Sequence, residues 1–80
     1  MKIHFSQKAI KEYKKLPKSY CNLVDKTFQK LLNNEIVDII PVEGSENVFR
    51  IRVGRYRIIV EKFENDFLVA SIQTRGDVYK

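Results

Sequence analysis

The chain has 80 residues, of which 44% are hydrophobic and 31% are charged. This length accommodates one domain with a thin core, and the composition excludes a disordered tail. A net charge of +5 favours an anionic partner, and the single cysteine, Cys21, excludes an internal disulfide. With no apolar run typical of a signal peptide or a membrane span, we expect residues 1–80 to form one cytoplasmic domain.

The first 34 residues predict a short strand followed by a helical hairpin. Residues 2–5 alternate polar and apolar side chains, which is typical of a strand. Ser6 is a suitable N-cap for a helix that Pro17 ends. Ser19 is the expected N-cap of a second helix, which Asn33-Asn34 ends. Because the link between these helices is short, they must fold back on each other.

The second half of the chain predicts an antiparallel meander. Residues 35–47 fit either a short strand or a loop, and Pro41 argues against a central strand. Residues 48–53 alternate strictly, and Gly54-Arg55 suits a type II′ turn into a strand over 56–62. A third strand covers residues 67–73. The fold class is therefore α+β in the order β-α-α-β-β-β, with the helical hairpin on one face of the sheet.

A two-residue turn sets the register of the first hairpin, so that Arg52 lies opposite Arg57 and Arg50 points to the same side. For the second hairpin we expect a three-residue loop over 64–66, which opposes Ile58 to Ile72. This register assigns Leu68, Ala70 and Ile72 to the core, and it places Ser71, Gln73 and Arg75 beside the arginines.

Four arginines are therefore predicted on the face of the sheet away from the helices: Arg50, Arg52, Arg57 and Arg75. Residues 1–40 contain eight Lys and no Arg, whereas all five Arg lie in residues 41–80. Like charges opposite each other destabilise a sheet, and arginine is the residue suited to bidentate contact with phosphate. The pattern favours a phosphate-binding surface. The alternative is an ordinary solvated face on which Glu61 neutralises one arginine.

The run VFRIRVGRYRIIVEKF and the terminal TRGDVYK resemble the RelE/ParE superfamily of toxins from type II toxin–antitoxin pairs, and within it the RelE branch. The resemblance covers nearly the whole chain and implies the fold described above. It also implies an endoribonuclease that cuts mRNA on the ribosome without a metal or other cofactor, and that a cognate antitoxin silences. The catalytic positions that it implies are Arg50, Arg52, Arg57, Arg75 and Tyr79.

Four further residues are candidate RNA contacts: Arg55, Gln73, Lys11 and Lys15. The two lysines belong to a basic stripe on the first helix that could dock on ribosomal RNA, although a solvated helix face explains that stripe equally well. Arg55 lies in a turn, where solvation alone explains it. Glu61 and Glu46 are the candidates for a general base. With one Cys and one His, no metal-ligand cluster is expected.

Two other functions remain open from the sequence. The chain could be a binding module, either a ParE-like inhibitor of gyrase or a RelE homologue without activity. It could also bind nucleic acid without cleaving it, in which case RNA affinity depends on salt but the RNA stays intact.

Overall fold

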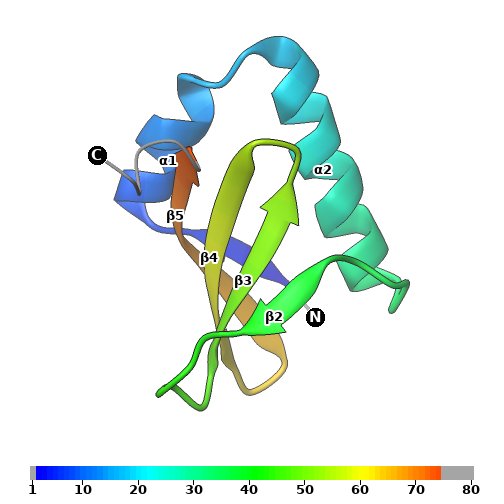
Figure 1. The fold of residues 1–80 in the computed structure, drawn as a ribbon, viewed down its shortest axis with the longest axis vertical. Helices are drawn as coiled ribbons and strands as arrows, with labels where there is room; N and C mark the ends of the chain where they lie inside the picture. The colour runs from blue at the N-terminus through cyan, green and yellow to red at the C-terminus, as the bar shows by residue number, and fades with distance from the viewer. Residues whose placement is uncertain (1, 75–80) are drawn as a thin grey trace.

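A computed structural model describes residues 2–74, which form one five-stranded sheet and two helices (Figure 1). The expected α+β class is confirmed, with one short strand, β2, added to the predicted order. Within the described residues no helix is long and apolar enough to cross a membrane. In chain order the elements are β1 (Ile3–Phe5), α1 (Gln7–Lys14), α2 (Lys18–Leu32), β2 (Ile39–Pro41), β3 (Val48–Val53), β4 (Tyr56–Phe63) and β5 (Asp66–Thr74).

The strands lie in the order β1-β5-β4-β3-β2 across the sheet. β1 runs parallel to β5, and the other neighbours are antiparallel. The helix α1 contacts β5, whereas α2 contacts β3, so the two helices cover different parts of the sheet.

A contact between side chains joins the start of β5 to β1. His4 Nε2 lies 3.1 Å from Asp66 Oδ2, and the Lys2 N–H donates to the same carboxylate. These two contacts hold the pKa of Asp66 below its usual value.

The helix ends are partly as predicted. The Ser6 hydroxyl accepts a hydrogen bond from the Ala9 N–H at 3.0 Å, which confirms the cap of α1. The predicted cap of α2 is wrong, because this helix begins at Lys18 and Pro17 occupies the cap position. Pro17 cannot donate a backbone hydrogen bond, and its restricted φ suits a helix start. Asn34 has a φ of 59° just after α2 and confirms the predicted stop.

A hydrogen bond between side chains joins the two helices. The Tyr13 hydroxyl of α1 donates to Asp25 Oδ1 of α2 at 2.8 Å. This hydrogen bond, together with burial, raises the pKa of Tyr13 to about 12 from the ordinary value of 10.0. Loss of the phenol proton would place two negative charges in contact, so the folded state keeps that proton more firmly than the unfolded chain does.

Because its pKa is raised in the folded state, Tyr13 should stabilise the protein at neutral pH and lose this contribution at alkaline pH. The contribution is fully present below pH 10 and is lost as the pH rises from 10 towards 12, because only the unfolded chain releases the proton in that range. Tyr13→Phe removes this contribution. In urea unfolding, the difference in stability between the two proteins should therefore shrink from about pH 9 to about pH 11.5. A difference that stays constant with pH would contradict this prediction.

The segment 35–47 contains the short strand that the sequence left open. Ile39 and Pro41 of β2 pair with Ile51 and Phe49 of β3. β2 lies at an edge of the described sheet, which is where a proline can occur because its missing N–H breaks no ladder.

The β3–β4 hairpin has the predicted register, with Val53 opposite Tyr56 and Arg52 opposite Arg57. Gly54 has a φ of +58°, a conformation that favours glycine. A Cβ at this position would also lie 2.9 Å from Cε1 of Tyr20 on α2. The glycine therefore serves both the turn and the close approach of the second helix.

The β4–β5 hairpin differs from the prediction. Phe63 pairs with Asp66, so the loop has two residues rather than three. A bulge at Ala70 then restores the expected pairing of Ile58 with Ile72. The bulge reverses the alternation of side chains along β5. As a result Leu68 and Ala70 are only half-buried, contrary to the prediction, and Phe67 and Val69 are buried instead.

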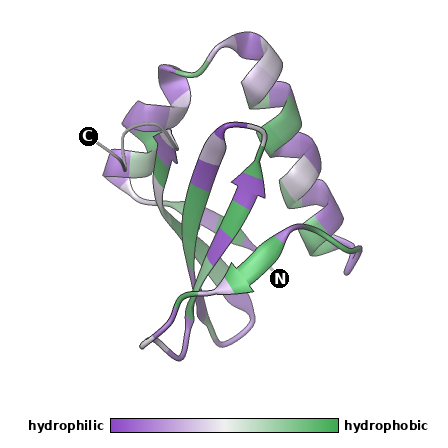
Figure 2. Ribbon diagram, viewed as in Figure 1, coloured by the Kyte–Doolittle hydropathy of each residue, from purple (hydrophilic) through white to green (hydrophobic). Residues whose placement is uncertain are grey.

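The core lies between the helices and one face of the sheet. Figure 2 shows hydrophobic and hydrophilic residues alternating along β3, as expected for a strand with one buried face, whereas β4 contains a continuous hydrophobic stretch. This alternation leaves the opposite face to the polar residues. The buried residues of the core are Ala9, Val24, Phe28, Ile51, Val53, Ile58, Val60, Phe67, Val69 and Ile72.

Candidate RNA-binding face and adjoining cleft

Three arginines lie on the face of the sheet opposite the core, as predicted. Arg50 and Arg52 alternate with the buried Ile51 and Val53 on β3, and Arg57 on β4 lies directly opposite Arg52. The pairing continues onto β5, where Gln73 lies opposite Arg57 and Ser71 opposite Ile59. We call this surface the arginine face; it consists of Arg50, Arg52, Arg57, Ser71 and Gln73.

The three arginines differ in their partners. Arg52 Nε lies 3.1 Å from Asp38 Oδ2, in an exposed ion pair. The Nε atoms of Arg50 and Arg57 are buried, and neither has a hydrogen-bond partner in residues 2–74. Neither side chain forms an ion pair within residues 2–74, so the positive charges of Arg50 and Arg57 are available to an external acceptor.

The carboxylate that neutralises one arginine is not the one suggested by the sequence. Glu61 was a candidate, but it forms no ion pair within the described residues. Asp38 lies just before β2 and reaches Arg52, fourteen positions further along the chain. No local spacing signals this contact, because it depends on the pairing of β2 with β3.

The other predicted site residues lie at different distances from the arginine face. Gln73 belongs to it, and its amide Nε2 donates to Ser71 Oγ at 3.2 Å. Arg55 is exposed at the β3–β4 turn, and Lys11 is exposed on α1. Lys15, also exposed, lines a cleft beside the end of β5. Arg75 and Tyr79 lie outside the described residues.

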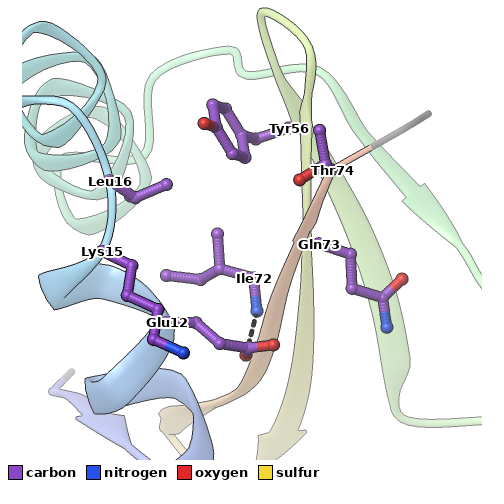
Figure 3. Close-up of a pocket in the computed structure, with 7 residues that line it drawn as sticks. All are labelled: Glu12, Lys15, Leu16, Tyr56, Ile72, Gln73 and Thr74. Carbon is purple, nitrogen blue, oxygen red and sulfur yellow. Dashed lines mark hydrogen bonds between the residues drawn. The ribbon is translucent and has the colours of Figure 1, made fainter. Parts of the chain in front are cut away.

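The cleft lies between the end of α1 and the ends of β4 and β5, and has a volume of about 500 Å³. Its apolar walls are Leu16, Tyr56 and Ile72 (Figure 3). Glu12, which was not predicted to belong to the site, lies in this cleft and accepts a hydrogen bond from the Ile72 N–H at 2.9 Å. Its position on α1 gives no sequence signal, since a single glutamate on a helix is usually solvated.

These features make the arginine face suited to an extended polyanion. Two guanidinium groups on neighbouring strands can hold non-bridging phosphate oxygens, and the Gln73 amide lies beside them. Such donors are held in place by the sheet before any ligand arrives, which is what stabilisation of developing negative charge requires.

Comparison with solved structures shows several with this fold. A RelE chain from a RelB–RelE complex of Methanococcus jannaschii has a TM-score of 0.82 at 24% identity, covering 96% of this chain and 95% of that one. A chain from the RelE–RelB complex of Pyrococcus horikoshii gives 0.76 at 23% identity, with 94% of each chain covered. YoeB of Staphylococcus aureus gives 0.78 at 17% identity, covering 91% of this chain and 94% of that one.

No curated protein matches the sequence. The sequence profile of one family, described as the ParE toxin of the type II toxin–antitoxin system parDE, matches residues 3–79. This match covers almost the whole chain and agrees with the fold. The chain therefore belongs to the ParE toxin family, within the RelE/ParE superfamily of type II toxin–antitoxin toxins.

Proposed function

We propose that this toxin is an endoribonuclease that cleaves mRNA on the ribosome in the cytoplasm and so inhibits translation. The observation that carries the proposal is that Arg50 and Arg57 lie on one face of the sheet and form no ion pair within residues 2–74. Like charges close together on a sheet do not stabilise the fold, whereas a phosphate placed between the two guanidinium groups would accept hydrogen bonds from both.

The proposed reaction needs no metal ion. The 2′-hydroxyl of one nucleotide attacks the adjacent phosphorus, the P–O5′ bond breaks, and the products carry a 2′,3′-cyclic phosphate and a 5′-hydroxyl. A base accepts the 2′ proton, and the 5′ oxygen takes up a proton as it leaves. Negative charge grows on the non-bridging oxygens, where Arg50 and Arg57 would stabilise it.

The remaining residues take supporting roles in this proposal. Arg52, held by Asp38, adds positive charge beside Arg57 and orients the substrate backbone. Arg75 and Tyr79, which lie outside the described residues, would complete the catalytic set. Arg55 and the lysines of α1 would contact ribosomal RNA through salt-dependent electrostatic attraction.

The second proposal concerns the partner, a cognate antitoxin. The RelE chains of Methanococcus jannaschii and Pyrococcus horikoshii with the same fold were solved in complex with RelB. In this chain a groove of about 550 Å³ between α1 and α2 is lined by Phe5, Ile10, Tyr13 and Phe28. Since the chain carries a net charge of +5, an acidic amphipathic segment suits this groove.

A second candidate function is inhibition of DNA gyrase. The match to the ParE toxin family supports it, because a ParE-like chain is expected to inhibit gyrase. A gyrase inhibitor needs no pair of guanidinium groups prepared for phosphate. The two functions therefore differ in whether Arg50 and Arg57 are required for toxicity.

Mapping RNA ends on translating ribosomes tests the proposal. Purified protein is added to ribosomes with a defined mRNA, and in parallel to the same mRNA alone. We expect new 5′-hydroxyl ends within the reading frame in the presence of ribosomes, and none after preincubation with the antitoxin. A folded protein that leaves the mRNA intact but blocks supercoiling by gyrase would establish the second candidate instead.

A further inference from the structure

The cleft beside β5 has the features of a small-molecule site rather than of a packing defect. Its volume of about 500 Å³ lies within the range of ligand pockets, and it combines apolar walls with a few polar groups. Tyr56 forms one wall, and its ring is fixed by an edge-to-face contact with Tyr20 at a centroid distance of 4.7 Å. Leu16 and Ile72 provide further apolar surface, so a flat aromatic ligand would find contact on its faces.

Two charged side chains, Glu12 and Lys15, line this cleft, and Glu12 is the one held against the edge of β5. Glu12 is half-buried, and its Oε1 is held by the Ile72 N–H at 2.9 Å. That N–H is available because β1 pairs with β5 only as far as Val69. No second hydrogen bond to the Glu12 carboxylate is formed within residues 2–74, so this group retains capacity to accept hydrogen bonds from a ligand.

The negative charge of Glu12 means that this part of the cleft binds a different chemical group from the arginine face. A carboxylate repels phosphate and accepts hydrogen bonds only, so the part of a ligand that contacts Glu12 must present donors. The arginine face, in contrast, presents donors to phosphate. Gln73 lines the cleft as well (Figure 3), and because it lies opposite Arg57 in the sheet, the cleft adjoins the arginine face.

A nucleotide chain can reach both surfaces. At residues 72–74 no strand covers the outer edge of β5 within the part of the chain described, so only the width of one strand separates the cleft from the arginine face. A phosphate bound by Arg57 would then have the base of an adjoining nucleotide beside Glu12. Lys15, at the same cleft, can contact the next phosphate.

We propose that this cleft binds a nucleobase and that Glu12 selects guanine. The proposal rests on the proposed function, because it takes RNA as the ligand of the arginine face. Guanine presents its N1–H and N2 amino group side by side, and one carboxylate can accept from both. Adenine and cytosine place a ring acceptor next to their amino group, and uracil places carbonyl oxygens on both sides of its N–H, so each of these bases directs a lone pair at the carboxylate.

Equilibrium binding of RNA that cannot be cleaved tests this assignment. Six-nucleotide RNAs with 2′-O-methyl groups carry guanine, inosine, adenine, cytosine or uracil at one position in an otherwise constant sequence, and fluorescence anisotropy gives their affinities for the full chain. We expect guanine to bind about tenfold more tightly than the other natural bases, the scale of one bidentate contact. Inosine lacks the N2 amino group and should lose most of that advantage.

Glu12→Gln is the informative variant. The amide oxygen can still accept from the Ile72 N–H, so the fold should be retained, while the amide presents one donor and one acceptor to the ligand. The variant should lose the preference for guanine and gain affinity for adenine, whose edge matches an amide. Glu64→Gln, at the exposed β4–β5 turn, makes the same chemical change and should leave the preference unaltered.

The outcomes separate this proposal from the nuclease. Equal affinity for all five RNAs, or an unchanged guanine preference in Glu12→Gln, would overturn the assignment of the cleft even if the protein cleaves mRNA. A guanine preference that Glu12→Gln abolishes, in a protein that cuts no RNA on the ribosome, would support the cleft and reject the nuclease.

Discussion

Arg57→Ala should reduce the rate of mRNA cleavage on the ribosome by about 10²- to 10³-fold, the range found when one preorganised donor to a developing oxyanion is removed. The buried Nε of Arg57 has no partner in residues 2–74, and the side chain lies on the central hairpin, where the sheet holds it in place. The loss should appear in the cleavage step, measured in single turnover, more than in the affinity for ribosomes.

The free energy of unfolding should change much less in Arg57→Ala than the cleavage rate does. Arg57 lies opposite Arg52, and relief of this repulsion contributes about 0.2–1 kcal/mol in favour of the variant. The lost packing of the arginine stem acts in the opposite direction. We therefore expect the free energy of unfolding to change by less than about 1 kcal/mol, so that loss of cleavage cannot be attributed to unfolding.

Lys26→Ala is the matched control for this experiment. Lys26 is exposed on α2, and the substitution removes one positive charge away from the arginine face. The rate of cleavage by this variant should stay within a few-fold of the original rate, because the lost charge only weakens the long-range attraction of RNA. If both variants cleave equally well, the arginine face is not the catalytic surface.

Ile58→Ala should destabilise the protein by about 2–5 kcal/mol, through lost burial and the cavity left behind. Ile58 is fully buried in β4, the middle strand of the sheet, and lies between Ile51 and Ile72 on the neighbouring strands. Domains of this size have a total stability near the lower end of about 5–15 kcal/mol. The variant should therefore be partly unfolded at 37 °C.

Urea unfolding followed by circular dichroism measures this effect. Ile36→Ala provides the control, because Ile36 is 97% exposed and the same atoms are removed. Its stability should change by less than about 0.5 kcal/mol. A loss of less than about 1 kcal/mol in Ile58→Ala would mean that the core around β4 is not packed as described.

Local patterns in the sequence were sufficient for much of the fold. The β3–β4 register followed from a two-residue turn, because such a turn leaves only one pairing open and Gly54 accepts the positive φ that it needs. The cap at Ser6 and the stop at Asn34 are also contacts within a few residues. These local patterns therefore place Arg50, Arg52 and Arg57 on one face without any information from the tertiary structure.

Contacts between distant segments could not be predicted in the same way. The two-residue loop after Phe63 and the bulge at Ala70 compensate for each other, so the pattern of β5 did not reveal either of them. The helix α2 has Pro17 rather than Ser19 at its cap position. Both residues suit a helix start, so the local sequence does not choose between them.

The sequence by itself determined which residues alternate on the central hairpin, and hence that guanidinium groups gather on the face away from the core. Only the tertiary structure decided that Asp38 neutralises Arg52, that the Nε atoms of Arg50 and Arg57 stay without partners in the described residues, and that Glu12 reaches the edge of β5. The physical reason is range: strand alternation and tight turns act over a few residues, whereas the partner of a charge depends on which strands and helices pack together.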